Sequence, residues 1–462
     1  MKQKIIPVLV ISLLLLFSCK KETENEKNLP VTEDETTEEQ NRSGHHGHLK
    51  ETNDFSSEVA VKWLNLQLRI IKVPPGVAGA SPQRLFAYCG IALYESVVEG
   101  MPHYQSIARQ LNQLPALPKT ERGKAYHWAT CANSALASMN RNLLSAAPDA
   151  SQMSMDSLEN ALSTAFKTQT SPSTFQRSVE YGKAIAQVIF DWSKTDGTFN
   201  VNPPYVPPGT LPGAAPGLWI PFPSTAIPVN PYTGNLRLLV KGSNWGTEPS
   251  PPPAYSADPS SAYYAMVKDV YDVSQNLTPE QTALALYYRD SPGYPGGGHY
   301  TSMLTQVLEK ANKSLDVAAL AYVRTGIALL DALIACWKTK YTVNLERPVQ
   351  SVRGILGYAT WLPLFNAPAH PEFPSAHSNQ AAAFEVAMAS VFGNRFEFTN
   401  HTYDFLGLPP RSYHSFSQLT QEIGISRLYA GIHYRASIEK GKQQGDRVAR
   451  NILWKLRFRK WH

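Results

Sequence analysis

Three short stretches in the last third of the chain carry residues whose types could hold an oxyanion. They are "KYTVNLERP" at 340–348, "HPEFPSAH" at 370–377 and "SRLYAGIH" at 426–433. In the first, Lys340 and Arg347 are seven residues apart, close to two helical turns, so both cationic side chains would leave one face of a helix. Pro348 would end that helix. Two cationic side chains at this spacing most often lie on a solvent-exposed helix face. The other two stretches are needed to decide whether this pair binds an anion.

The second stretch predicts an anion-binding helix start. Pro374 and Ser375 precede an alanine-rich helical pattern, which makes Ser375 the expected N-cap. The free amides and the positive end of the helix dipole favour an oxyanion there, and Ser375 and His377 add a hydroxyl and a titratable imidazole.

The third stretch contributes Arg427 and His433, which are six residues apart. On a continuous helix they would lie about 120° apart rather than on one face. Either Gly431 bends the chain between them, or Arg427 wraps around the helix to reach the same ligand. The sequence leaves both possibilities open.

Together, Lys340…Arg347-Pro348, Pro374-Ser375-Ala376-His377 and Ser426-Arg427…His433 resemble the three-part signature of a known superfamily. It contains the type 2 phosphatidic acid phosphatases and the vanadium-dependent haloperoxidases. The resemblance covers about residues 330–445, and "RLFAYCGIALYESV" in the N-terminal half is similar to the haloperoxidase branch of exported bacterial proteins.

The resemblance implies a pocket for phosphate or vanadate. Lys340, Arg347 and Arg427 would neutralise the oxygens of the anion, and Ser375 and the amide of Ala376 would donate to them.

Two histidines would then carry the chemistry. His377 would act as general acid and base. His433 would be the axial ligand of vanadium in a haloperoxidase, or the nucleophile that forms a phosphohistidine in a phosphatase.

Three features favour the haloperoxidase. Trp337 stands where haloperoxidases carry an aromatic residue, the chain lacks a bundle of membrane spans, and its helical N-terminal half is larger than a compact acid phosphatase needs. The expected cofactor is orthovanadate, and the expected substrates are hydrogen peroxide, halide and a small organic acceptor. The alternatives are a histidine acid phosphatase for phosphomonoesters or lipid pyrophosphates, without a cofactor, and a non-catalytic oxyanion-binding lipoprotein.

One position indicates which halide is used, and two others differ from the residues that are usual in the superfamily. His370 stands where bromide-using relatives tend to have histidine, which favours bromide or iodide. Ala376 replaces the usual glycine, and its methyl group could crowd the anion. Ser437 replaces the aspartate that usually orients the second histidine, and Glu439 is the expected substitute.

One further segment, "YYRDSPGYPGGGHY" at 287–300, is a candidate for the pocket entrance. Its Asp290 and His299 could line that entrance, and Asp290 could supply a counter-charge to a strongly positive pocket. The alternative is an ordinary surface turn.

The elements that must position these residues are predicted to be helices, because apolar residues recur at spacings of three and four with little alternation. We expect an all-α fold with an N-terminal bundle at 55–199, a packed proline-rich excursion at 200–260 and a C-terminal catalytic bundle at 261–462. Proline density in the excursion forbids helix interiors and central strands. Cys89, Cys131 and Cys336 show no metal-ligand spacing, and buried thiols are expected.

The N-terminus predicts export. Residues 1–18 carry two lysines and a short apolar run, and "LFSC" resembles a lipobox that would leave Cys19 lipidated. Residues 19–54 are polar and read as a disordered tether. We therefore expect a lipid-anchored protein of a Gram-negative envelope, on the periplasmic or surface face of the outer membrane, that touches the membrane only through its lipid. A net charge of +6 is too dilute to indicate a nucleic-acid partner.

Overall fold

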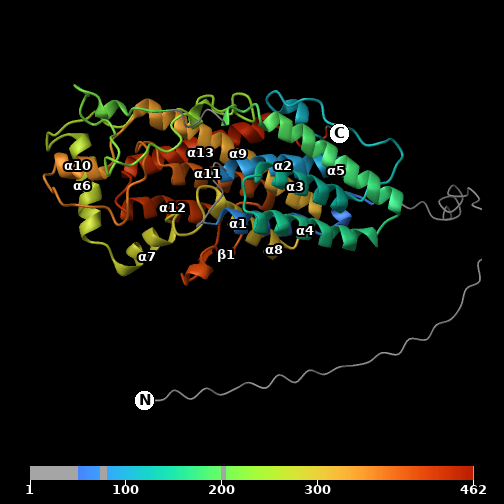
Figure 1. The fold of residues 1–462 in the computed structure, drawn as a ribbon. Helices are drawn as coiled ribbons and strands as arrows, with labels where there is room; N and C mark the ends of the chain where they lie inside the picture. The colour runs from blue at the N-terminus through green and yellow to red at the C-terminus, as the bar shows by residue number, and fades with distance from the viewer. Residues whose placement is uncertain (1–49, 73–80, 199–203, 461–462) are drawn as a thin grey trace, which may run out of the picture. The chain divides into compact units, whose positions relative to one another are not determined.

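The computed structural model describes residues 50–72, 81–198 and 204–460, and this part of the chain is all-α, as predicted (Figure 1). The predicted signal peptide, Cys19 and most of the tether lie outside it. The helices are α1 (Glu58–Ile71), α2 (Pro82–Val97), α3 (Trp128–Leu143), α4 (Asp149–Lys167), α5 (Pro172–Ser193), α6 (Ala262–Gln275), α7 (Pro279–Tyr287), α8 (Gly298–Ala311), α9 (Leu315–Val343), α10 (Pro348–Gly354), α11 (Ala376–Phe392), α12 (Phe416–Tyr429) and α13 (Arg435–Lys455). Two three-residue strands, β1 (Phe398–Asn400) and β2 (Arg411–Tyr413), pair antiparallel.

The N-terminal helices form where the apolar spacing predicts them. Ser81 caps α2 and Ser171 caps α5, each followed by a proline at the first helical position, a favoured arrangement because that residue has no intrahelical N–H partner. Helix α3 packs against α2, α4 and α5. The packed part of the chain already includes Thr52, whose hydroxyl donates to Val97 O at 2.7 Å.

Helix α9 runs through the centre and joins the two halves. It packs against α2 on one side and against α11 and α13 on another. Among the described residues it is long and apolar enough to cross a membrane, but 89% of its most apolar window is buried inside the protein. Its hydrophobicity therefore reflects burial between helices.

The proline-rich segment packs on the helices. Trp219 is buried and its backbone N–H donates to Asn344 O at 2.8 Å. The buried carboxylate of Asp331, midway along α9, accepts hydrogen bonds from the N–H groups of Leu239 and Val240 and from the hydroxyl of Ser243. These bonds satisfy backbone groups that a coil segment could not otherwise pair when buried.

Helices α11 and α13 lie against each other and against α9 (Figure 1), and the segments that lead into α11 and α13 carry His370, Glu372 and His433. The contact between the two helices is close because α13 has glycine where it meets the start of α11. A Cβ at Gly441 would stand 2.3 Å from Ser375 O, and one at Gly445 would stand 1.9 Å from Asn379 O. Gly441 and Gly445 are four residues apart and so lie on the same face of α13, where the lack of side chains lets α11 approach closely.

Candidate oxyanion site

Lys340 and Arg347, the two cations of the first motif, belong to two different helices. The prediction that they leave one face of a single helix was therefore wrong. Helix α9 ends at Val343, and Asn344 takes the left-handed conformation at φ 53°, a common residue for that role. Arg347 is the N-cap of α10 and Pro348 is its first residue. Pro348 therefore begins a helix rather than ending one.

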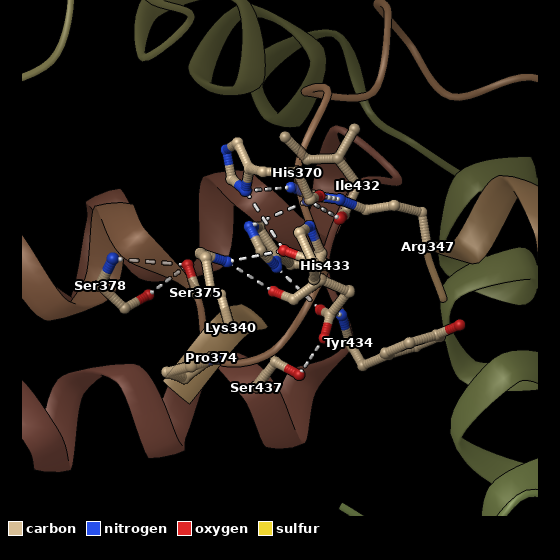
Figure 2. Close-up of polar contacts among 12 residues, drawn as sticks. Lys340, Arg347, His370, Pro374, Ser375, Ser378, Ile432, His433, Tyr434 and Ser437 are labelled. Atoms are coloured by element: carbon tan, nitrogen blue, oxygen red, sulfur yellow. Dashed lines mark hydrogen bonds and ion pairs between the residues drawn. The ribbon is translucent and has the colours of Figure 1, made fainter. Parts of the chain in front are cut away.

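The two cations nevertheless converge (Figure 2). Lys340 is fully buried and donates through Nζ to the carbonyls of Pro371 at 3.0 Å and Glu372 at 2.8 Å. Arg347 donates through Nε to His370 O and through Nη1 to Ile432 O, both at 2.9 Å. The turn after α9 lets Arg347 reach the site from the side opposite Lys340.

The second motif forms the predicted helix start. Ser375 is the N-cap of α11 and accepts from the amide of Ser378 at 3.4 Å and from its hydroxyl at 3.1 Å. Because Ser375 Oγ is the acceptor in both bonds, its own hydroxyl proton is left to donate. Ala376, the first residue of α11, lines the cavity next to this helix start.

In the third motif the chain bends at Gly431. Of the two possibilities left open by the sequence, a bend at Gly431 or a continuous helix around which Arg427 wraps, the structure has the bend. Helix α12 ends at Tyr429, Gly431 has φ 73° and α13 begins at Arg435, so a side chain at 431 would be strained. The turn places His433 beside Arg347. Arg427, near the end of α12, is buried, and its closest polar partners are Ser426 Oγ at 3.2 Å and Ala285 O at 3.4 Å.

The protonation of His433 follows from its neighbours. Arg347 Nη1 lies 3.3 Å from His433 Nε2, and a guanidinium can only donate, so Nε2 is the acceptor. The ring proton is then on Nδ1, which donates to Glu372 Oε1 at 2.7 Å. Burial, followed by the charges of Arg347 and Lys340, lowers the pKa of His433 well below its usual value. His433 is therefore a neutral imidazole with its lone pair on Nε2.

Glu372 is the carboxylate that orients His433, and it was missed from the sequence. Its side chain is fully buried and also accepts from Tyr434 N at 2.9 Å and from Ser437 Oγ at 2.5 Å. The proposed substitute, Glu439, is exposed and accepts a bond from Gln443 on the same helix. Ser437 thus replaces the usual aspartate by holding a carboxylate from another segment. The available signal was an acidic residue inside "HPEFPSAH", five residues before His377.

The electrostatics of the cluster favour an anion. Burial lowers the pKa values of Lys340, Arg347 and Arg427, and nearby acidic groups oppose part of that shift. Within the described part of the chain, the hydrogen-bond acceptors of all three are carbonyls, a hydroxyl and histidine nitrogens rather than carboxylates. Three buried cations without a bonded counter-ion match the requirements of an oxyanion with several negative oxygens.

A cavity of about 100 Å³ adjoins the cluster and is lined by His370, His377 and His433. His377 Nε2 lies 3.1 Å from Asp290 Oδ1, so the predicted entrance carboxylate does reach the pocket. Trp337 also lines it, with its ring 5.1 Å from that of His370.

His299 does not line this cavity, contrary to expectation. It is buried behind the wall, with Nδ1 3.1 Å from the hydroxyl of Tyr403 and Nε2 3.4 Å from the amide of Asn400. Burial lowers the pKa of His299 to about 3. All three described cysteines are free and buried.

Comparisons with known proteins agree with this geometry. The family model for the VCPO second helical-bundle domain matches residues 321–459. The structure of a bacterial vanadium-dependent iodoperoxidase is 30% identical in sequence, with a TM-score of 0.77 over 88% of this chain and 97% of that one.

Two structures of bacterial vanadium-dependent chloroperoxidase, in apo and holo forms, share only 18% identity. Their TM-scores are 0.61 and 0.58, over 82% and 90% of this chain and 95% and 96% of theirs. They support the fold alone. No protein of curated function matches the sequence significantly.

Proposed function

The chain belongs to the vanadium-dependent haloperoxidase family, and from this premise we propose that it oxidises halide with hydrogen peroxide to a hypohalous-acid equivalent. Bromide and iodide are the favoured halides. His370 in the cavity wall supports that choice, as does the likeness to a protein described as an iodoperoxidase.

One observation carries the proposal: His433 presents an Nε2 lone pair next to three buried cations. This donor set fits vanadate, since a neutral imidazole nitrogen can ligate vanadium while Lys340, Arg347 and Arg427 neutralise its oxygens. Bound vanadate would supply Lewis-acid activation of hydrogen peroxide toward halide.

The protein's own residues have separable tasks in this scheme. Ser375 and the amide of Ala376 would donate to the anion at the start of α11. His377, held by Asp290 at 3.1 Å, is placed to take up and return protons. Trp337 and His370 would form one wall of the halide site.

The same geometry suits two other functions. An imidazole lone pair beside buried cations can attack phosphorus, as in a histidine phosphatase acting on phosphomonoesters or lipid pyrophosphates. The cluster could also hold an oxyanion without turnover.

A parallel assay separates the three functions. The purified full chain is titrated with orthovanadate while bromination and iodination of phenol red with peroxide, and hydrolysis of a phosphomonoester, are followed. Halogenation that depends on vanadate supports the proposal. Phosphate release that vanadate inhibits, without halogenation, would overturn it, and vanadate binding without either activity would favour a non-catalytic role. His433→Ala should abolish activity, whereas His401→Ala, at an exposed histidine, should not.

We also propose that the protein is attached to the envelope of a Gram-negative bacterium through lipid on Cys19. The proposal rests on the sequence of residues 1–19. Partition into detergent and labelling with a fatty-acid analogue should both be lost in Cys19→Ser. Retention of the label in that variant would contradict the proposal.

A further inference from the structure

Two exposed tryptophans share a cation on the surface, although they are far apart in the chain. Trp245 belongs to the proline-rich segment and Trp454 to the last turn of α13, and they are 68% and 79% exposed. The ammonium of Lys455 lies 4.4 Å from the ring centroid of Trp245 and 5.5 Å from that of Trp454. The other tryptophans that the structure describes are buried or half-buried. Large apolar side chains gathered at the surface mark an interaction site.

The fold holds Trp245 in this exposed position. Its backbone N–H donates to Gly242 O at 3.2 Å, and Gly242 has φ 72°. A Cβ at Gly242 would stand 2.5 Å from Trp245 Cε2, so the indole lies directly over this glycine. From α13, Asn451 donates through Nδ2 to the carbonyls of Ser243 at 2.9 Å and Trp245 at 3.0 Å. These contacts fix the ring at the surface instead of burying it.

Basic side chains lie beside the two rings. Arg447 and Arg450 precede Trp454 by seven and four residues, which places all three on one exposed face of α13. Residues 447–460 contain six basic residues and no acidic one. Three carboxylates oppose these charges, those of Asp446, Glu248 and Glu385. The surface around the indoles therefore keeps a surplus of positive charge.

We propose that the surface formed by Trp245, Trp454, Lys455, Arg447 and Arg450 (the indole patch) docks on a bilayer that carries anionic phospholipids. Indole rings favour the boundary between headgroups and acyl chains, and lysine and arginine beside them attract anionic headgroups. The stem of Lys455 can lie along the rings while its charge reaches the headgroups.

This contact goes beyond the proposed catalytic function. It is also additional to lipid on Cys19, which the sequence predicted to be the sole contact with the membrane. A bilayer surface matches both the charge and the apolar rings of the indole patch.

Other occupants match the indole patch less well. A second copy of the chain would bring two positive surfaces together. The chain's own acidic stretch at 22–39 has the opposite charge but no aromatic side chain, so it would leave both indoles exposed. Single-stranded nucleic acid can stack on aromatic rings, but a protein expected outside the cytoplasm would not meet it there.

The test is flotation of the full chain with lipid vesicles. Every protein carries Cys19→Ser, so that lipid on this cysteine contributes to none of the measurements and the rest of the N-terminus is the same in all. We expect a partition coefficient at least about tenfold higher on vesicles with about 30% phosphatidylglycerol than on pure phosphatidylcholine. Sodium chloride at about 0.5 M should remove most of that difference.

The aromatic part of the indole patch is tested by Trp245→Ser/Trp454→Ser. This variant should bind the anionic vesicles about tenfold more weakly, because two rings no longer leave water. The matched control, Met153→Ser/Ile227→Ser, removes two apolar side chains that are 64% and 83% exposed elsewhere and should bind as the wild type does. Brominated acyl chains should quench the fluorescence of the wild type more than that of Trp245→Phe/Trp454→Phe.

The cationic part is tested by Arg447→Gln/Arg450→Gln. Binding to the anionic vesicles should fall about fivefold for each charge removed, the effect of one cation near such a surface. The control is Lys310→Gln/Lys313→Gln, at two exposed lysines around the end of α8, which should retain the wild-type affinity. Thermal unfolding verifies that each variant is folded, and the phenylalanine variant replaces the serine one if the latter is not.

Equal partition of the wild type on the two kinds of vesicle would overturn the proposal. So would folded indole-patch variants that bind as the wild type does. Binding to a single-stranded oligonucleotide but not to vesicles, lost in the same variants, would assign the indole patch to nucleic acid instead. None of these measurements uses vanadate, peroxide or halide, so their outcome is separate from that of the proposed function.

Discussion

His433 and Glu372 are 61 residues apart in the chain, yet His433 Nδ1 lies 2.7 Å from Glu372 Oε1. The carboxylate fixes the ring orientation and leaves the lone pair on Nε2, which faces Arg347 Nη1 at 3.3 Å. A histidine that ligates a metal gains basicity from such a partner, and removing one typically costs about 10- to 100-fold in affinity.

Glu372→Gln should therefore weaken vanadate binding by about 10- to 100-fold. Calorimetry or ⁵¹V NMR on the purified chain measures this without reference to turnover. The matched control is Glu439→Gln, because Glu439 is exposed and accepts a hydrogen bond from Gln443 on the same helix. Equal affinities in the two variants would show that Glu372 does not support the metal ligand.

Ser437→Asp, which restores the residue usual in the superfamily, should destabilise this protein. Ser437 Oγ lies 2.5 Å from Glu372 Oε2, so the substitution would bring two buried carboxyl groups together, at a cost of about 3 kcal/mol. The double variant Ser437→Asp/Glu372→Gln has a single carboxyl group at this place. Its free energy of unfolding, measured in urea, should recover at least half of the loss caused by Ser437→Asp alone. Simple additivity of the two substitutions would contradict this relationship.

Gly441→Ala should disturb the helix crossing that supports the site. Its Cβ would stand 2.3 Å from Ser375 O, so either α13 or the start of α11 must move, with a loss of about 1–3 kcal/mol in unfolding free energy. Gly354→Ala is the control, since that helical position has open space around it and alanine favours a helix. Comparable losses in both variants would count against a specific role for the crossing.

Asp331 should make stability depend on pH. Burial raises the pKa of Asp331 to about 7, above its value of about 3.9 in an unfolded chain. Because the folded form binds the proton more tightly, its contribution to stability is greatest below about pH 4 and falls as pH rises through 7. Asp331→Asn should flatten the change in melting temperature between pH 5 and pH 8. An unchanged slope would assign the pH dependence to other groups.

Local patterns in the sequence predicted much of the molecule. Apolar spacing gave the helices, and Pro374-Ser375 gave the N-cap of α11. The residues of the three motifs do come together. The first motif was misplaced because a single left-handed residue, Asn344, ends α9 without interrupting the apolar pattern.

The remaining features depend on contacts between distant segments. Glu372 lies in the segment before α11 and His433 in the segment before α13, so their contact depends on how the starts of two helices far apart in the chain meet. His299 was misassigned because proximity in the chain to Asp290 does not fix which side of the wall its ring occupies.

The stretch from 370 to 377 supplies His370, Glu372, Ser375, Ala376 and His377 within eight consecutive residues. In the proposed function this one segment would supply a wall of the halide site, the support of the metal ligand, donors to the anion and the proton carrier. A shift in its backbone would therefore affect all of these tasks at once.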